Sequence, residues 1–183
     1  MMLAIMKKIY IFAVIKFKIK MKPFVSIIMG STSDMPIMEE AVKFLKEIGI
    51  DYDIQALSAH RTPELVMDFA KKAKKRGVQV IIAGAGGAAH LPGVIAAFTA
   101  IPVIGVPIKS SNSIDGWDSV LSILQMPAGI PVATVALNGA RNAAILAAQM
   151  IGTGNKDIYK KLSDFKESMK SKVIEANLAL QKK

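Results

Sequence analysis

The residues best suited to chemistry form a short run, Ser58-Ala59-His60-Arg61-Thr62-Pro63, in a chain that has only two histidines. Imidazole exchanges protons near neutral pH, which suits His60 to act as a general acid or base. The guanidinium of Arg61 can bind a phosphate or a carboxylate through two parallel hydrogen bonds. The run therefore predicts a proton-transfer group beside an anion-binding group. The alternative is a loop that leads into a helix and contains an incidental histidine.

A second candidate is the run Gly30-Ser31-Thr32-Ser33-Asp34, which directly precedes a predicted helix. Free backbone N–H groups and the helix dipole favour phosphate at such a position, and the hydroxyls of Ser31 and Ser33 add donors. Asp34 can bind ribose hydroxyls. The alternative is that Asp34 only caps the helix.

A third candidate, residues 84–89, matches the pattern G-x-G-x-x-A after a predicted strand. A dinucleotide site also needs an acidic residue about 20 positions further on, and the chain has none between Asp68 and Asp115. We therefore interpret Gly84 and Gly86 as small residues that let backbone amides approach a small polar group. The alternative is a tight turn that allows close packing of strand and helix.

His90 and Leu91 follow this glycine run, and His90 either bonds to the carbonyls of the run or lines a pocket. Further along, Gly105 to Ser110 faintly resembles a phosphate loop but lacks the second glycine before Lys109. No other motif indicates ATP use, so we expect a reaction without nucleotide hydrolysis.

Alternating strands and helices must position these runs. Such alternation predicts an α/β domain with a central parallel sheet of about five strands and helices on both faces. Ligands bind such sheets beyond the carboxyl ends of the strands, near the point where the strand order reverses. That rule selects the loops 30–34, 58–62 and 84–90. The predicted strands are 23–29, 52–57, 78–83, 103–106 and 132–137, and the predicted helices are 35–48, 63–76, a short one from 91, 116–124, 139–151 and 157–180.

Two helix starts have recognisable signals. Asp34 is the predicted N-cap of the first helix, and Thr62 that of the second, with Pro63 as its first residue. If so, the backbone direction set at Thr62 and Pro63 turns His60 and Arg61 toward the cleft.

Composition excludes several classes of function. The chain has 183 residues, 52% of them hydrophobic, as expected for one compact domain. Its net charge is +10, but the first twenty residues carry five lysines and no acid, so the rest has only +5. Aromatic residues make up 6%, too few for base stacking, and we predict no nucleic-acid binding. There are no cysteines and no HExxH motif, and two histidines cannot make a three-histidine site, so we predict no metal.

The first twenty residues need a separate interpretation. Their longest uncharged run after Lys8 covers residues 9–15, far short of the roughly 20 residues that span a bilayer. No small-x-small cleavage site precedes the first strand, although a basic segment lying on a membrane surface is an alternative. We predict that residues 1–20 are an extension outside the fold, that the natural start is Met21, and that 21–183 form a single domain in the cytoplasm without membrane contact.

Several long motifs together resemble one family. Between about Phe24 and Ile151, the chain is similar to the N5-carboxyaminoimidazole ribonucleotide mutases of de novo purine synthesis, also called the catalytic subunit of phosphoribosylaminoimidazole carboxylase. The motifs that carry the resemblance are GSTSD, SAHRTP, AGAGGAAHLPGVIAAFT, PVIGVP, DGWDSVLSILQMPAGIPVATVA and NAAILAAQ.

The resemblance implies a three-layer flavodoxin-like fold, a homo-octamer, a small ribonucleotide substrate, and no cofactor or metal. It implies an isomerase that moves a carboxylate from the exocyclic amine of the aminoimidazole to a ring carbon, through release and recapture of CO2. It also implies functional coupling to the ATP-dependent N5-carboxyaminoimidazole ribonucleotide synthase, which makes this substrate.

The resemblance also implies roles for individual residues. His60 is the general acid and base, Ser31 and Asp34 hold the ribose phosphate, and Ser33, Ser58 and Arg61 lie nearby. The backbone of residues 84–87, which includes Gly84 and Gly86, surrounds the migrating carboxylate together with His90 and Leu91.

Two alternatives stay open. One is direct carboxylation of aminoimidazole ribonucleotide by CO2; that sister class tends to have Lys after the histidine, so Arg61 favours the mutase. The other is a non-catalytic module that binds ribonucleotides through the same loops. One departure from the family concerns residues 136–142, where the segment is shorter than usual and its contacts to the site are hard to predict.

Overall fold

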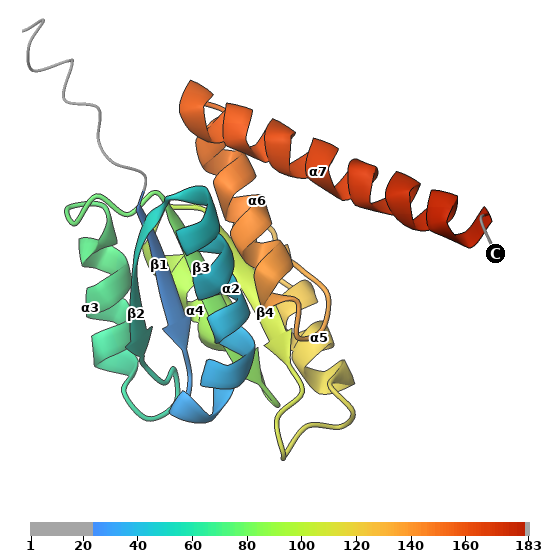
Figure 1. The fold of residues 1–183 in the computed structure, drawn as a ribbon. Coiled ribbons are helices and arrows are strands. Elements are labelled where there is room, and N and C mark those ends of the chain that lie inside the picture. The colour runs from blue at the N-terminus through green and yellow to red at the C-terminus, as the bar shows by residue number, and fades with distance from the viewer. Residues whose placement is uncertain (1–23, 182–183) are drawn as a thin grey trace, which may run out of the picture.

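A five-stranded parallel sheet forms the centre of the protein, in the order β2-β1-β3-β4-β5, with helices on both faces (Figure 1). This is the strand order of flavodoxin-like folds, as the resemblance implied. The computed structural model describes residues 24–181, so the extension predicted for residues 1–20 lies outside the described residues. The elements are β1 (Phe24–Met29), the 3-10 turn η1 (Thr32–Asp34), α2 (Met35–Ile48), β2 (Asp51–Ala56), α3 (Pro63–Ala73), β3 (Val80–Gly86), α4 (Leu91–Phe98), β4 (Val103–Ile108), α5 (Trp117–Leu124), β5 (Ala133–Thr134), α6 (Ala140–Gly152) and α7 (Lys156–Gln181).

Alternate residues of the inner strands enter two separate cores. In β1, Val25, Ile27 and Met29 pack with α2 and α6, whereas Ile28 packs on the other face with α3 and α4. Because both faces are covered, β3 and β4 are apolar along their length rather than alternating. The two cores hold the strands in register, so the loops at their carboxyl ends meet at one edge of the sheet.

Three strands end two or more residues away from the predicted positions, and one of them, β4, runs to Ile108 instead of 106. β3 runs to Gly86, three residues beyond the predicted end, so Gly84 and Gly86 belong to the strand and not to a loop. Glycine has low strand propensity, but pairing with β4 continues as far as Gly86 opposite Ile108. β5 is shorter than predicted, with only Ala133 and Thr134 in ladder pairing at the sheet edge.

The two predicted capping residues hold the right positions, but neither makes a side-chain capping bond to its helix. Asp34 precedes α2 without a side-chain capping bond, and Ser31 instead caps η1 by accepting from the Ser33 N–H. Thr62 precedes α3, but its hydroxyl accepts from the Ser58 N–H at 3.0 Å and donates to the Ser58 carbonyl at 3.1 Å. Thr62 therefore closes the loop that contains His60 instead of capping the helix.

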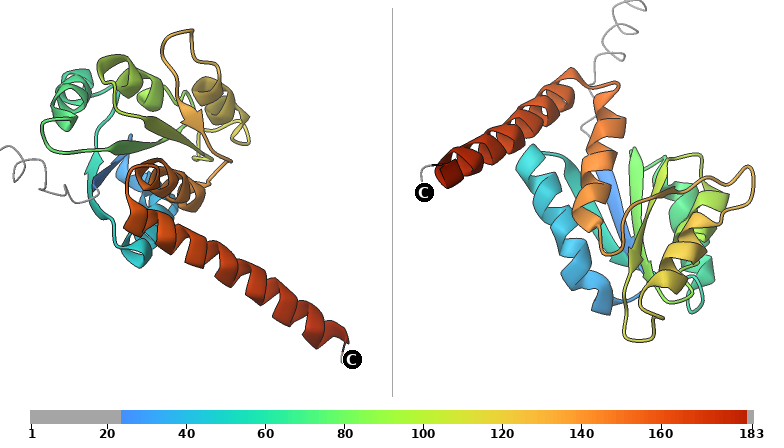
Figure 2. Two further views of the ribbon diagram at one scale, coloured as in Figure 1. Left: turned by 90° about the horizontal axis from the view of Figure 1, so that it is seen from above. Right: turned by 90° about the vertical axis from the view of Figure 1, so that its right-hand side faces the viewer.

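The last helix leaves the body of the domain. Two views show α7 leaving the end of α6 and running outward past the other helices (Figure 2). Its first turns bury Ile158 and Leu162 in the core that contains α2 and α6, but the later turns are exposed. No helix within residues 24–181 is both long and apolar enough to cross a membrane.

Candidate functional site

A cleft of about 400 Å³ lies at the carboxyl ends of β1 to β4. β1 and β3 are neighbours in the sheet although β2 separates them in sequence, so the strand order reverses here. The cleft therefore lies where this class of fold binds its ligands. Its lining residues are Gly30, Ser31, Ser33, Asp34, Ser58, Ala59, His60, Arg61, Ala85, Gly86, Ala88, His90, Leu91, Ser110, Ser111 and Asn112.

Arg61 ties the first two loops of the cleft together. Its Nη2 donates to the Gly30 carbonyl at 2.8 Å, and its Nε donates to the Ser58 Oγ at 3.3 Å. On the β1 side, the Ser33 hydroxyl donates to the Ser31 Oγ at 2.9 Å. A cation, several hydroxyls and the start of α2 thus gather at one end of the cleft, an arrangement that suits a phosphate.

The two histidines meet across the cleft. His60 Nε2 and His90 Nδ1 are 2.8 Å apart, and the two rings are nearly perpendicular at 87°. One nitrogen must donate and the other accept, so the contact holds a single proton between the rings. Two fully protonated rings would place two N–H donors face to face. The contact therefore places two proton-exchanging groups side by side in the cleft.

Asp34 is the carboxylate of the cleft and is only 6% exposed. Burial raises the pKa of its carboxyl above the ordinary value, and a backbone hydrogen bond with Ser31 offsets part of the rise. Because the side chain makes no capping bond to α2, helix capping does not account for a buried acid at this position. A ligand hydroxyl that donates to the carboxylate would offset its burial.

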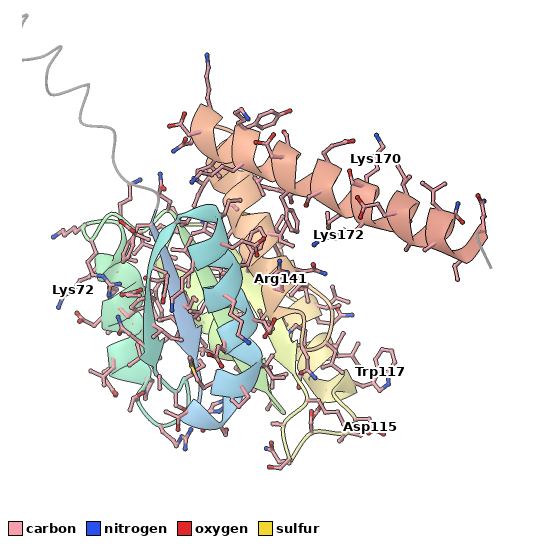
Figure 3. All side chains as sticks on the ribbon, in the orientation of Figure 1. Lys72, Asp115, Trp117, Arg141, Lys170 and Lys172 are labelled. Atoms are coloured by element: carbon pink, nitrogen blue, oxygen red, sulfur yellow. The ribbon has the colours of Figure 1, made fainter. Side chains whose placement is uncertain are left out.

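The opposite wall is made of small residues from β3 and a loop after β4. A Cβ added to Gly86 would lie 2.4 Å from the Ser110 Oγ, so the loop after β4 can approach β3 only because residue 86 is glycine. Asp115 and Trp117 mark the far end of this loop, at the lower right of Figure 3. A hydrogen bond from the Lys109 N–H to Asn138 Oδ1 at 3.0 Å holds its start.

Comparison with known proteins identifies the family. The family described as AIR carboxylase matches residues 24–172, most of the chain and every loop of the cleft. The chain belongs to the AIR carboxylase family. Several of its curated relatives are similar over most of their own length. The N5-carboxyaminoimidazole ribonucleotide mutase of Pyrococcus horikoshii is 58% identical over 154 residues, which cover 84% of this chain and 86% of that protein.

Other members of the AIR carboxylase family differ in length and in name. The Thermotoga maritima N5-carboxyaminoimidazole ribonucleotide mutase is 56% identical over 153 residues, 84% of this chain and 89% of that protein. The Candida glabrata phosphoribosylaminoimidazole carboxylase is 50% identical over 160 residues, 87% of this chain but 28% of that protein. The crystal structure of Treponema denticola PurE superposes with a TM-score of 0.78 at 34% identity, covering 87% of this chain and 99% of that one.

Nine of the ten residues predicted for the site line the cleft, and Gly84 does not. A Cβ at Gly84 would lie 2.5 Å from the Met38 Sδ, so this glycine serves the packing of β3 against α2. Sequence reasoning missed Ser110, Ser111 and Asn112 in this AIR carboxylase family member. The signal was available, since these polar residues follow the carboxyl end of β4, which neighbours β3.

Within residues 24–181, no three side chains of histidine, aspartate or glutamate lie close enough together to hold a metal ion. The cleft itself is lined by the two histidines, Arg61, Asp34 and a set of hydroxyls and amides.

Proposed function

We propose that this chain converts N5-carboxyaminoimidazole ribonucleotide to 4-carboxyaminoimidazole ribonucleotide, with His60 as the general acid and base. Family membership and relatives named as mutases at 56% and 58% identity support the reaction. The observation that carries the role of His60 is its 2.8 Å contact with His90 in a cleft that also contains Arg61 and Asp34. A proton-transfer group then lies beside groups that suit a ribose phosphate.

The proposed reaction has two proton transfers. His60 gives a proton to the exocyclic nitrogen as the bond between that nitrogen and the carboxyl carbon breaks, and the bonding electrons go to the nitrogen. This step releases CO2 inside the cleft. The ring carbon then attacks CO2 to form the new carbon–carbon bond, and His60 removes the proton from that carbon. His60 ends in its starting state, so the isomerisation consumes no ATP and no net proton.

We assign the remaining predicted residues to binding. Ser31, Ser33, Ser58 and Arg61 hold the phosphate, and Asp34 accepts hydrogen bonds from the ribose. Gly86, His90 and Leu91 surround the carboxylate. Support for this division comes from the cleft itself, since its cation and its buried acid lie on the β1 and β2 side.

The test is an assay with two substrates. The purified chain is given N5-carboxyaminoimidazole ribonucleotide in one assay and aminoimidazole ribonucleotide with bicarbonate in the other. We expect turnover of the first without ATP, and a loss of roughly 10³-fold in turnover in His60→Asn, because a positioned acid and base contributes about 10² to 10⁴. The affinity of His60→Asn for aminoimidazole ribonucleotide is the control and should change by less than about threefold, since Asn keeps a polar side chain there.

Other outcomes distinguish the alternatives. Activity only with aminoimidazole ribonucleotide and high bicarbonate would assign the chain to direct carboxylation. A His60→Asn protein that turns over like the unaltered chain would contradict the assignment of His60. If neither substrate reacts but both bind, the chain is a ribonucleotide-binding module.

We also propose that the chain forms a homo-octamer. Apolar side chains on one face of α5, Trp117, Leu121 and Leu124, are between 51% and 67% exposed. The outer turns of α7 likewise expose Met169 and Val173, and Trp117 projects outward in Figure 3. Exposed apolar patches on soluble proteins often mark contact surfaces. Sedimentation should give eight times the 19.6 kDa of one chain, and a monomer would contradict the proposal.

Two further predictions concern the enzyme that supplies the substrate and the cellular location of the chain. Coupling to the ATP-dependent synthase stays a proposal, supported by relatives such as the Candida glabrata protein, in which the matching region is 28% of a longer chain. A cytoplasmic location is likewise a prediction, and it fits a chain without cysteines.

A further inference from the structure

The loop between β4 and α5 is held at both ends and contributes a wall of the cleft. At its start, the Lys109 N–H donates to Asn138 Oδ1 at 3.0 Å, and the Ser119 hydroxyl donates to the Ile108 carbonyl at 2.8 Å. An ion pair of 2.9 Å between Lys109 Nζ and Asp115 joins the two sides of the loop. The three cleft residues that follow Lys109 are therefore carried by a loop with its own internal bonds.

The side-chain amide of Asn112 is hydrogen-bonded within this loop. The Ser110 hydroxyl donates to Asn112 Oδ1 at 2.7 Å, so the oxygen of the amide is occupied and the nitrogen points elsewhere. Nδ2 lies over Gly87, where an added Cβ would be 3.1 Å from it. No residue between 24 and 181 accepts a hydrogen bond from Nδ2. Asn112 thus offers the cleft an unused donor.

This donor lies in the part of the cleft that has no charged side chain. The lining from β3 and β4 consists of alanines, a glycine, Leu91, His90, two serines and Asn112. The phosphate has a better site beside Arg61, because charge-assisted hydrogen bonds are about twice as strong as neutral ones. A neutral donor suits the migrating carboxylate better, because this group exists first as a carboxylate, then as uncharged CO2, and then as a carboxylate again. A cation here would stabilise the carboxylate and oppose its release.

We propose that Asn112 Nδ2 donates a hydrogen bond to the migrating carboxylate, and so holds it before CO2 is released and after it is recaptured. This inference rests on the proposed function of the cleft. It assigns a binding residue to a loop from which sequence reasoning selected none. It also gives Ser110 a part in the site, since its hydroxyl donates to Asn112 Oδ1 and leaves Nδ2, beside Gly87, to donate elsewhere.

The test compares two ligands that differ only in the carboxylate. Affinities for aminoimidazole ribonucleotide and for 4-carboxyaminoimidazole ribonucleotide are measured by calorimetry. In Asn112→Asp the donor is lost and a carboxylate faces a carboxylate. We expect the affinity for the carboxylated ligand to fall by roughly 10- to 150-fold, and that for the other ligand to change by less than about threefold. Asn112→Ala should show the same selectivity with a smaller loss of about tenfold.

Asn177→Asp is the matched control, because it makes the same chemical change on an exposed turn of α7. It should leave both affinities as they are in the unaltered chain. Equal losses for the two ligands in Asn112→Asp, or no loss in either, would overturn the role of Asn112. Absence of turnover in the unaltered chain would instead contradict the proposed function. If the unaltered chain turns over but Asn112→Asp keeps the same ratio of affinities for the two ligands, only the role of Asn112 is contradicted.

Discussion

The two sides of the cleft differ in charge. The side formed after β1 and β2 holds Asp34 and Arg61 with three serines, whereas the side formed after β3 and β4 holds small apolar residues, two serines and an amide. The histidines join the two sides, His60 from the loop after β2 and His90 from the segment after β3. Fixed charge is therefore confined to one end of the cleft, with the two histidines in the middle.

This difference matches a substrate whose two ends behave differently. A phosphate keeps its charge throughout, so a cation and an array of donors can bind it equally in every state. A group that alternates between carboxylate and CO2 changes its charge, and a strong charge beside it would favour one state over the other. The neutral side can bind the carboxylate through hydrogen bonds and still contain CO2 among small apolar groups.

Among changes to the two sides of the cleft, the largest effect on turnover should come from adding one methyl group to the neutral side. In Gly86→Ala the new Cβ would lie 2.4 Å from the Ser110 Oγ and 3.0 Å from the Ile108 carbonyl, which is backbone and cannot turn away. The loop after β4 must then move. We expect turnover to fall by about 100-fold, because misplacement of about 1 Å in a site can cost that much.

Steady-state turnover with N5-carboxyaminoimidazole ribonucleotide measures the Gly86→Ala effect. Gly154→Ala is the matched control, since a Cβ there would meet nothing within 4 Å. Affinity for aminoimidazole ribonucleotide should stay nearly the same in Gly86→Ala, because the charged side is not altered. Full turnover in Gly86→Ala would mean that the loop after β4 can move without loss of turnover. The position of the neutral side would then matter less for the reaction than we propose.

A second effect, on affinity instead of turnover, should come from the charged side. In Arg61→Gln the guanidinium that we assign to the phosphate is removed, and both ribonucleotides carry that phosphate. We expect their affinities to fall by the same factor, roughly 10- to 150-fold, as for hydrogen bonds to charged groups. Calorimetry with both ligands measures this, in direct contrast to the selective loss expected for Asn112.

Arg141→Gln controls for loss of an arginine outside the cleft. Arg141 forms an ion pair of 2.9 Å with Glu47 and lies on α6 (Figure 3). Arg141→Gln should leave the affinities for both ribonucleotides unchanged. A selective loss of the carboxylated ligand in Arg61→Gln would show that Arg61 reaches the neutral side, and the division of the cleft would be wrong.

The sequence predicted the charged side better than the neutral side, for physical reasons. Loops 30–34 and 58–62 have clear signals, since hydroxyls, a proline and charged residues follow strand-like runs. The rule for parallel sheets then brings them together. Gly84 and Gly86 were assigned to a loop because glycine disfavours strands, and only the pairing of β3 with β4 as far as Ile108 shows otherwise.

Contacts between distant segments could not be predicted. His60 and His90 are 30 residues apart, and their hydrogen bond depends on side-chain rotamers that no pattern encodes. Asn138 lies in the shortened segment 136–142, whose role was left open. It adopts φ of 59° and accepts from the Lys109 N–H, which fixes the loop that carries Asn112. The role of Asn138 in holding this loop depends on its left-handed backbone conformation and on a tertiary contact, and neither can be read from the sequence pattern.

The smallest predicted effect is on stability and concerns the buried acid of the charged side. Burial raises the pKa of Asp34 in the folded state, whereas an unperturbed Asp has a pKa of about 3.9. The folded state therefore holds the proton more tightly than the unfolded state. Stability is greatest below the unfolded-state pKa and falls as the pH rises through the folded-state pKa. Asp34→Asn removes this loss, because Asn stays neutral.

Thermal melting at several pH values tests the buried acid. The melting temperature of Asp34→Asn should match that of the unaltered chain near pH 4, exceed it increasingly as the pH rises through the raised folded-state pKa of Asp34, and exceed it by a constant amount above that pKa. Asp68→Asn, an exposed acid paired with Lys72 on the surface of α3, is the control and should show no such trend. A lower melting temperature for Asp34→Asn at neutral pH would mean that the fold needs the charge. If Asp34→Asn raises the stability of the fold but lowers the affinity for both ribonucleotides, then Asp34 serves ligand binding at the expense of stability.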